Sequence, residues 1–295
     1  RFYSAEKASL CHHPANQVTA VAAITDKLPP ITSLQNARIK DVIKLRQRSH
    51  RDDRNLMIVE GYRELKMALD NRHNPTEVYF CPALFQGENE PDLLARCLEN
   101  GAQLLECSAP VFEKIAYRDR PDGLLAVAPQ VRHTLADLKL SKSPLLVVAE
   151  AIEKPGNLGT ILRSADAAGA DAVIVCDRCT DINNPNVVRA SIGALFSLPV
   201  VEASSAETLE WLKQHRIQIV AATPHARQFY NDADFEKGSA IVLGTEQYGL
   251  SDQWMKGTNL AVRIPMLGQA DSLNVASAAT ILLYEAVRQR GGRKS

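Results

Sequence analysis

The second half of the chain alternates short, almost uninterrupted runs of Val, Ile, Leu and Ala with stretches of helical periodicity. Runs this apolar are typical of parallel strands that helices bury on both faces. They are LLVVAE (145–150), AVIVCD (172–177), LPVVEA (198–203), IQIVAAT (217–223), AIVLG (240–244) and LAVRIP (260–265). We expect helices between them, including one that begins near Asn157 and one over 186–196. Residues 145–295 are therefore predicted to form a doubly wound α/β domain.

A weaker alternation of the same kind precedes this domain. Strand signals occur at MIVEG (57–61), VYFC (78–81), QLLEC (103–107) and GLLAVAPQ (123–130), with helical segments between them. Residues 31–130 are therefore predicted to be a smaller α/β domain, and residues 131–144 a linker that ends in Ser-Lys-Ser-Pro. Residues 1–30 are poor in acid and show no clear period, so we expect a flexible lead, or alternatively the remnant of a targeting segment.

Charge and cysteine usage limit the classes of function. Lys plus Arg and Asp plus Glu balance at 34 each, so a site for a polyanion has to be a local patch. No apolar run approaches the roughly 18 residues that a membrane span needs, which predicts that the protein has no membrane partner. The six cysteines are scattered, as expected for reduced thiols in the cytoplasm. A lone C-x-x-C begins at Cys176 without the second pair of a zinc site, and no metal is predicted.

A basic segment opens the smaller domain between Ser33 and Asn55. Its apolar residues are spaced as on one face of an amphipathic helix. Two interpretations are open: a helix whose charges are simply solvated, or an arm that contacts the phosphates of RNA. The cations that would contact RNA are Arg38, Lys40, Lys44, Arg46, Arg48 and Arg51.

Glycines and polar residues follow the first strand of the larger domain. Pro155-Gly156 breaks the strand, Asn157 is placed to cap the next helix, and Gly159 leaves room for another segment to approach closely. Arg163 follows on the same segment. Because the carboxyl ends of parallel strands meet at one edge of a sheet, we expect these residues to lie beside the loops of the C-terminal strands.

Two C-terminal strands also end in glycine-containing bends, in IVLGTEQYGLS (241–251) and in VRIPMLGQADSLNVASAATILL (262–283). Neighbouring bends of this kind offer backbone N–H and C=O groups, which suits a small polar ligand. The first bend is not a phosphate-binding P-loop, because Leu250 stands where that motif requires Lys. The patterns G-x-G-x-x-G and G-x-S-x-G, which mark dinucleotide-binding proteins and α/β-hydrolases, are absent from the expected places.

Taken in order, three segments resemble the motifs of the SpoU/TrmH family of the SPOUT superfamily. They are Asn157-x-Gly159-x-x-x-Arg163, Gly244-x-Glu246-x-x-Gly249-Leu250, and Ile264-Pro265-Met266 with Ser272-Leu273-Asn274-Val275. Members of this family are RNA ribose 2′-O-methyltransferases that use S-adenosylmethionine. The resemblance covers residues 145–295 well and residues 33–130 more loosely, as the family's RNA-binding domain. It implies an S-adenosylmethionine cofactor, a C-terminal trefoil knot and a homodimer.

The resemblance also implies roles for individual residues. The methyl donor would be surrounded, largely by backbone groups, by Thr223, Gly244, Ile264, Met266 and Leu273. The catalytic residues would be Arg163, Asn157, Glu246, Ser272 and Asn274. Because a guanidinium barely deprotonates in proteins, we expect Arg163 to hold the target phosphate and stabilise a developing alkoxide. The other four would orient Arg163 and the ribose, and Glu246 is the carboxylate among them that could take a proton. Helix capping would equally explain Asn157 and Ser272.

The target implied by the resemblance is RNA. Two domains suit a folded ribosomal RNA, which one domain holds while the other presents the methyl donor. Transfer RNA is the alternative target. A second class of function is a catalytically silent RNA-binding or ribosome-assembly factor, although the intact Asn157, Arg163, Glu246 and Asn274 favour an enzyme. An enzyme that methylates a nucleobase is disfavoured, because the three motifs resemble those of the ribose-modifying branch.

Overall fold

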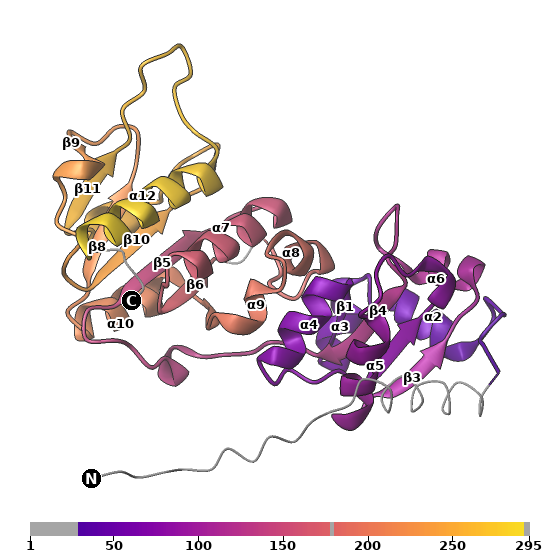
Figure 1. Ribbon diagram of the computed structural model, residues 1–295. Helices are drawn as coiled ribbons and strands as arrows, with labels where there is room; N and C mark the ends of the chain where they lie inside the picture. The colour runs from indigo at the N-terminus through magenta and orange to yellow at the C-terminus, as the bar shows by residue number, and fades with distance from the viewer. Residues whose placement is uncertain (1–28, 178–179, 292–295) are drawn as a thin grey trace, which may run out of the picture.

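Two β-sheets organise the chain in a computed structural model that describes residues 29–177 and 180–291 (Figure 1). Most of the predicted lead over residues 1–30, and the second cysteine of the C-x-x-C pattern, lie outside the described residues. The α/β class predicted from the sequence is confirmed.

The N-terminal sheet has four strands in the order β1-β4-β2-β3. The strands are β1 (Leu56–Glu60), β2 (Glu77–Phe80), β3 (Gln103–Glu106) and β4 (Leu124–Pro129). Strand β4 is antiparallel to both of its neighbours, whereas β2 and β3 are parallel. The helices around the sheet are α2 (Ala37–Lys44), α3 (Arg48–Arg54), α4 (Tyr62–Asp70), α5 (Glu90–Glu99) and α6 (Ala109–Ile115), with a 3-10 turn at Pro82–Leu84.

The C-terminal sheet has seven strands, all parallel, in the order β7-β6-β5-β10-β8-β11-β9. Six of them are the predicted runs: β5 (Leu145–Glu150), β6 (Ala172–Cys176), β7 (Val200–Ala203), β8 (Gln218–Ala222), β10 (Ser239–Leu243) and β11 (Leu260–Arg263). The two-residue strand β9 (Gln228–Phe229) has no apolar run and was not predicted. Strands β5, β6 and β10 are buried along their whole length, as the apolar runs indicated.

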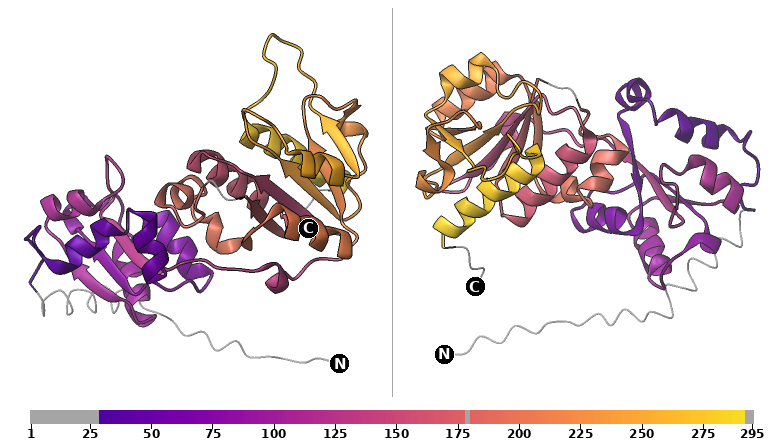
Figure 2. Two further views of the ribbon diagram at one scale, coloured as in Figure 1. Left: turned by 180° about the vertical axis from the view of Figure 1, so that it is seen from behind. Right: turned by 90° about the horizontal axis from the view of Figure 1, so that it is seen from above.

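Helices cover both faces of this sheet. Helices α7 (Pro155–Ala167) and α12 (Val275–Gln289) lie side by side on one face, and α10 (Ser205–Gln214) and α11 (Asp252–Gly257) cover the other (Figures 1 and 2). Alternate residues of β5 face opposite sides of the sheet: Val147 packs in the core on the α7 side and Val148 in the core on the α10 side. Two 3-10 turns, Leu135–Asp137 and Tyr230–Asp232, lie in the connections.

The helix predicted over 186–196 is broken into α8 (Pro185–Ala190) and α9 (Ala194–Ser197). Between them Ile192 and Gly193 both have a positive φ, of 53° and 79°. Gly193 lies against Met67 of the N-terminal domain, where a Cβ atom would be 2.7 Å from the Met67 Cβ. The break therefore places Gly193 in close contact with the N-terminal domain.

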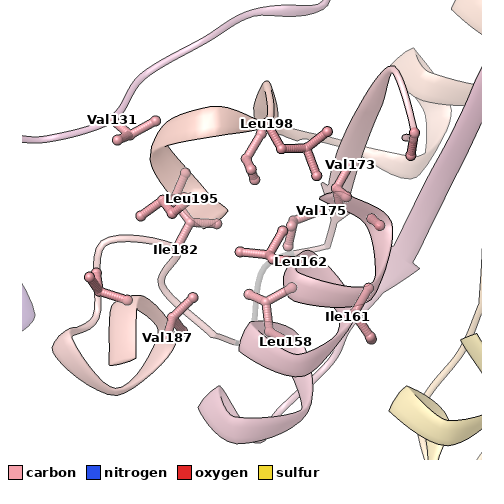
Figure 3. Packing of buried hydrophobic residues seen from close by; sticks show 14 of the residues in the cluster. Val131, Leu158, Ile161, Leu162, Val173, Val175, Ile182, Val187, Leu195 and Leu198 are labelled. Atoms are coloured by element: carbon pink, nitrogen blue, oxygen red, sulfur yellow. The ribbon is translucent and has the colours of Figure 1, made fainter. Parts of the chain in front are cut away.

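The two domains share one hydrophobic core. Leu158, Ile161 and Leu162 of α7 lie among Val173, Val175, Ile182, Val187 and Leu195, with Val131 of the connecting segment close by (Figure 3). The same cluster continues into α4, α5 and the N-terminal sheet. Arg51 of α3 adds a buried ion pair with Asp181, 2.5 Å between Nη2 and Oδ2, and the Val131 N–H donates to Asn183 Oδ1. The domains are thus joined by packing and by buried polar contacts.

Candidate active site

The strand order brings four loops together. Strands β5, β10, β8 and β11 are consecutive in the sheet and parallel, so their carboxyl ends form one edge. The loops that leave this edge begin at residues 151, 244, 223 and 264, and they carry the residues that the sequence singled out. The site lies at the boundary between β5 and β10, which are neighbours in the sheet although four other strands separate them along the chain. Open α/β sheets bind ligands at such positions, where the strand order changes direction.

Three of the predicted catalytic side chains meet at this edge. Oε1 of Glu246 accepts hydrogen bonds from Nδ2 of Asn157 and from Nδ2 of Asn274, both at 2.9 Å. The two amides also touch each other, with Asn274 Nδ2 3.1 Å from Asn157 Oδ1. Each of the three residues comes from a different motif, so the geometry joins segments that are 28 to 117 residues apart. We call Asn157, Glu246 and Asn274 the amide–carboxylate cluster.

Lys154 is a fourth member of this site that the sequence reasoning missed. Its Nζ lies 2.6 Å from Oε2 of Glu246, so the carboxylate is bonded on both oxygens. The hydrogen bond from Lys154 lowers the pKa of Glu246, and the carboxylate raises the pKa of Lys154 in return. A lysine directly before the Pro155-Gly156 break was visible in the sequence, but its partner is 92 residues away.

The capping functions differ from those expected at two positions. Helix α7 begins at Pro155, so Asn157 lies within its first turn and its side chain binds Glu246. At α12 the N-cap is Asn274, whose Oδ1 accepts from the N–H groups of Ala276 and Ser277. Asn274 therefore caps a helix with its oxygen and holds the cluster with its nitrogen. Ser272 caps nothing; its hydroxyl donates to Asp271, and it does not join the cluster.

Arg163 lies further along α7, on an exposed part of the helix. The next residue, Ser164, is 2.7 Å from Thr280 Oγ1, which fixes α7 against α12 at this point. Within the described part of the chain no side chain or carbonyl binds the Arg163 guanidinium. Its hydrogen-bond donors remain available to an anionic ligand, which agrees with the phosphate-holding function expected for it.

The five residues predicted for the methyl donor lie in the same loops. Gly244 has no room for a side chain, because a Cβ would overlap the backbone of Gly249 and Leu250. Thr223 follows β8 and donates its N–H to Val262. Ile264 and Met266 follow β11, and Leu273 precedes α12 with 39% of its surface exposed. The backbone groups of Met266 and Leu273 form no hydrogen bond with other described residues, so they are free to bind a ligand.

A buried acid outside the predicted set holds one of these loops. Oε2 of Glu150, the last residue of β5, accepts the N–H of Ser251 at 2.9 Å. Glu150 is 4% exposed. This contact ties the far end of the bend at 244–251 to the strand that leads to Lys154 and Asn157, so the two loops are held together by a carboxylate as well as by the sheet.

The basic segment of the N-terminal domain forms two helices, and its cations have different environments. The prediction that Arg51 contacts RNA is wrong, because its side chain is 2% exposed and is occupied by Asp181 and by the carbonyls of Leu45 and Arg46. Arg46 donates to the carbonyls of Lys114 and Ala116, and Arg38 to Glu77 and Gln103. Lys44 and Arg48 pair with Asp41 and Asp52. Lys40 is exposed and binds none of the described residues.

The described residues contain neither a candidate metal site nor a candidate membrane-spanning helix. No group of three or more His, Cys, Asp or Glu side chains there is arranged to hold a metal ion. The helices of the same residues are also too short or too polar to cross a membrane.

Comparison with known proteins gives the site its context. The model of the SpoU rRNA Methylase family matches residues 144–284, and that of an MRM3-like substrate binding domain matches residues 36–126. A 23S rRNA (uridine(2479)-2′-O)-methyltransferase of Streptomyces viridochromogenes is 34% identical over 270 residues, which cover 88% of this chain and 92% of the relative. The chain belongs to the SpoU family.

Other SpoU-family relatives agree in sequence and in fold. The 23S rRNA (guanosine(2553)-2′-O)-methyltransferase RlmP of Bacillus subtilis is 30% identical over 86% of this chain and 97% of its own length. A crystal structure of an RNA 2′-O ribose methyltransferase is 43% identical, with a TM-score of 0.78 over 89% of this chain and 99% of the other. The AdoMet-bound rRNA methyltransferase of Sinorhizobium meliloti is 31% identical, with a TM-score of 0.81 over 88% of this chain and 97% of the other.

Proposed function

We propose that this SpoU-family protein transfers the methyl group of S-adenosylmethionine to the 2′-hydroxyl of a ribose in ribosomal RNA. The observation that carries the proposal is the amide–carboxylate cluster, in which Asn157, Glu246 and Asn274 from three separate motifs meet at the carboxyl edge of the sheet. Arg163 lies exposed on α7, the helix that also carries Asn157. The relatives from Streptomyces viridochromogenes and Bacillus subtilis are 2′-O-methyltransferases of 23S ribosomal RNA, which favours ribosomal over transfer RNA as the target.

The residues at the sheet edge suit S-adenosylmethionine. Met266 and Leu273 offer backbone N–H and C=O groups that bind no other described residue and are of the kind that bind an adenine edge. Gly244 allows the two ends of the bend at 244–251 to approach each other closely. When bound, this cofactor supplies an electrophilic methyl group on a sulfonium. The residues Thr223, Gly244, Ile264, Met266 and Leu273 would hold it.

The chain's own residues contribute positioning and charge stabilisation to the proposed methyl transfer. A ribose hydroxyl is a weak nucleophile at neutral pH, so it has to be aligned with the methyl group and relieved of its proton. Arg163 would bind the adjacent phosphate and stabilise the negative charge that develops on the 2′-oxygen. Glu246 is a weak proton acceptor, because its pKa is lowered by Lys154. Its function in this proposal is to fix the amides of Asn157 and Asn274, with the proton passing to solvent.

Three further properties belong to the same proposal: a homodimer, a trefoil knot and a cytoplasmic location. Large apolar side chains are exposed on the loops of the site, with Tyr248 79% and Leu267 97% exposed, which supports an interface between two copies. The packing of α12 against α7 after the chain has left β11 supports a knotted C-terminus. Light scattering of the wild type and of Leu267→Asp tests the dimer: the wild type should have twice the mass of the chain, and the variant should dissociate.

Methyl transfer from labelled S-adenosylmethionine to total ribosomal and transfer RNA tests the function. Label in an alkali-resistant dinucleotide of ribosomal RNA, lost in Arg163→Ala and kept in Lys213→Ala on the opposite face of the sheet, is the expected result. Label in transfer RNA would correct the target, and label in a nucleobase would correct the reaction. No transfer to either RNA, with RNA binding retained, would identify a silent binding or assembly factor instead.

A further inference from the structure

Three polar residues outside the three motifs are buried in the turn that precedes helix α8. Thr180, Asp181 and Asn183 are each at most 5% exposed, and Ile182 between them points into the core that the two domains share (Figure 3). A buried polar group costs free energy unless it is hydrogen-bonded, so the partners of these side chains show what the turn holds. We call residues 180–183 the polar turn.

Two side chains of the polar turn bind the N-terminal domain and the segment that follows it. Oδ2 of Asp181 accepts from Nη2 and Nε of Arg51, at 2.5 and 3.2 Å. Asn183 binds both backbone groups of Val131: its Oδ1 accepts the N–H at 2.8 Å, and its Nδ2 donates to the carbonyl at 3.2 Å. The other oxygen of Asp181 accepts the N–H of Asn183, which fixes the shape of the turn. The position of the polar turn therefore depends on the docking of the N-terminal domain.

The third side chain binds the loop that leads to the active site. Oγ1 of Thr180 donates to the backbone carbonyl of Glu153, the residue before Lys154. Before Lys154, the backbone of this loop makes one other hydrogen bond with described residues, from the N–H of Ala151 to the carbonyl of Cys176. Ala151 has a φ of 50°, which is unfavourable for a residue with a Cβ, so the loop needs its surroundings to keep this path.

This loop aims two of the three side chains that bind Glu246. Lys154 binds Oε2 of Glu246, and Asn157, in the first turn of the helix that follows, binds Oε1. The Lys154 side chain is 68% exposed, and an exposed ion pair contributes little to holding a loop in place. The buried hydrogen bond from Thr180 is better suited to fix the backbone, because no water competes for the carbonyl there.

We propose that Thr180 is a positioning residue of the active site. Its hydroxyl fixes the loop that aims Lys154 and Asn157 at Glu246, and the polar turn couples this loop to the docking of the N-terminal domain. A displacement of about 1 Å can cost on the order of 100-fold in rate, so a small shift of the loop is measurable. The effect on rate rests on the methyl transfer proposed above, whereas the effect on the loop does not.

Removal of the Thr180 hydroxyl tests the effect on the reaction. Thr180→Val keeps the shape of the side chain and removes the donor, whereas Thr180→Ser keeps the donor. In single turnover we expect Thr180→Val to slow methyl transfer roughly 10-fold with unchanged Kd for S-adenosylmethionine and RNA, and Thr180→Ser to restore most of the rate. Thr258→Val is the matched control, because its hydroxyl binds the carbonyls of Ile219 and Leu260 at the amino edge of the sheet. A Thr180→Val variant as fast as this control would overturn the proposal.

Hydrogen exchange measures the loop itself and needs no catalysis. The exchange of amides in residues 151–158 is compared with that of strand β10, which reports global unfolding. Thr180→Val should speed exchange of the loop roughly 5- to 10-fold relative to β10, as expected for the loss of one hydrogen bond. Asn183→Ala, which removes both bonds to Val131, should speed it in the same direction, and Thr258→Val should not. An unchanged loop in Asn183→Ala would refute the coupling to the N-terminal domain, and an unchanged loop in Thr180→Val would refute the whole proposal.

A double variant distinguishes positioning from general damage. Because Thr180 acts through the contacts of Glu246, Thr180→Val should slow the Glu246→Gln variant by less than about twofold. Rate losses that multiply in full would mean that the hydroxyl acts on another part of the site.

The two proposals can fail separately. Methyl transfer by the wild type, with a Thr180→Val variant that matches the control in rate and exchange, would keep the enzyme and remove the positioning function. Faster exchange of the loop in Thr180→Val, without methyl transfer by the wild type, would keep the coupling of turn and loop and remove the enzyme.

Discussion

Nζ of Lys154 lies 2.6 Å from Oε2 of Glu246, across two loops that leave neighbouring parallel strands. The lysine completes a set of contacts in which Glu246 binds both amides of the cluster through its other oxygen. A single carboxylate therefore links the first, second and third motifs of the family. In the proposed function this carboxylate acts by geometry, because it fixes the orientation of all three side chains.

Glu246→Gln should lower methyl transfer by about 100-fold, because an amide cannot pair with Lys154 and the aim of Asn157 and Asn274 is lost. S-adenosylmethionine affinity should change little, since the proposal assigns cofactor binding to backbone groups of other residues. Single-turnover kinetics with cofactor titration measures the two effects separately. Glu153→Gln, an exposed acid beside Lys154, is the control and should keep full activity. A variant at position 246 that is as active as this control would remove Glu246 from the machinery.

The pH dependence of the Lys154–Glu246 pair follows from its pKa shifts. The pKa of Glu246 is lowered from 4.5, so its contribution to stability is present above that value and is lost as the pH falls through the folded pKa. The pKa of Lys154 is raised from 10.5, so its contribution is present below that value and is lost as the pH rises through the folded pKa. The difference in free energy of unfolding between wild type and Glu246→Gln should be constant from about pH 6 to about pH 9. Denaturant titrations across this range check it, and a step near pH 7 would contradict the assignment.

Arg51→Ala should destabilise the protein by about 3–5 kcal/mol, because it leaves the Asp181 carboxylate buried without its partner. Arg48→Ala on the same helix α3 is the matched control. The Arg48 side chain is 39% exposed and pairs with Asp52 at 3.4 Å. Arg48→Ala should therefore lower the free energy of unfolding by less than about 1 kcal/mol. Urea denaturation measures both. Equal losses would mean that the buried pair does not join the domains as the structure indicates.

Gly244→Ala should lower the free energy of unfolding by about 1–3 kcal/mol and weaken S-adenosylmethionine binding, because the added methyl group overlaps the backbone of Gly249 and Leu250 and forces the two ends of the bend at 244–251 apart. Gly268→Ala is the control, since a Cβ there meets open space. Calorimetry with S-adenosylmethionine and thermal denaturation report the two effects. If both alanine variants bind the cofactor like the wild type, the close approach at Gly244 is not needed for the site.

Much of the C-terminal fold could be predicted from the sequence. Each predicted apolar run there is a strand, because a strand buried on both faces needs side chains that are apolar at every position. The prediction of one helix over 186–196 was wrong, because the chain breaks it at Ile192 and Gly193, and Gly193 lies against Met67 of the other domain. Asn157 failed as a cap because helix α7 already begins at Pro155, and its side chain binds Glu246, which is 89 residues away, instead.

The sequence by itself determined where six of the seven strands of the C-terminal sheet lie and that three segments are motifs of the SpoU family, because these depend on local patterns of burial and on residue types in fixed spacing. Only the tertiary structure decided which side chains meet. Strand order places β10 beside β5, and this alone brings Glu246 to Lys154. Docking of the two domains buries Arg51 against Asp181. A charged residue in a sequence is not necessarily exposed in the structure, because an oppositely charged side chain far along the chain can pair with it in the protein interior.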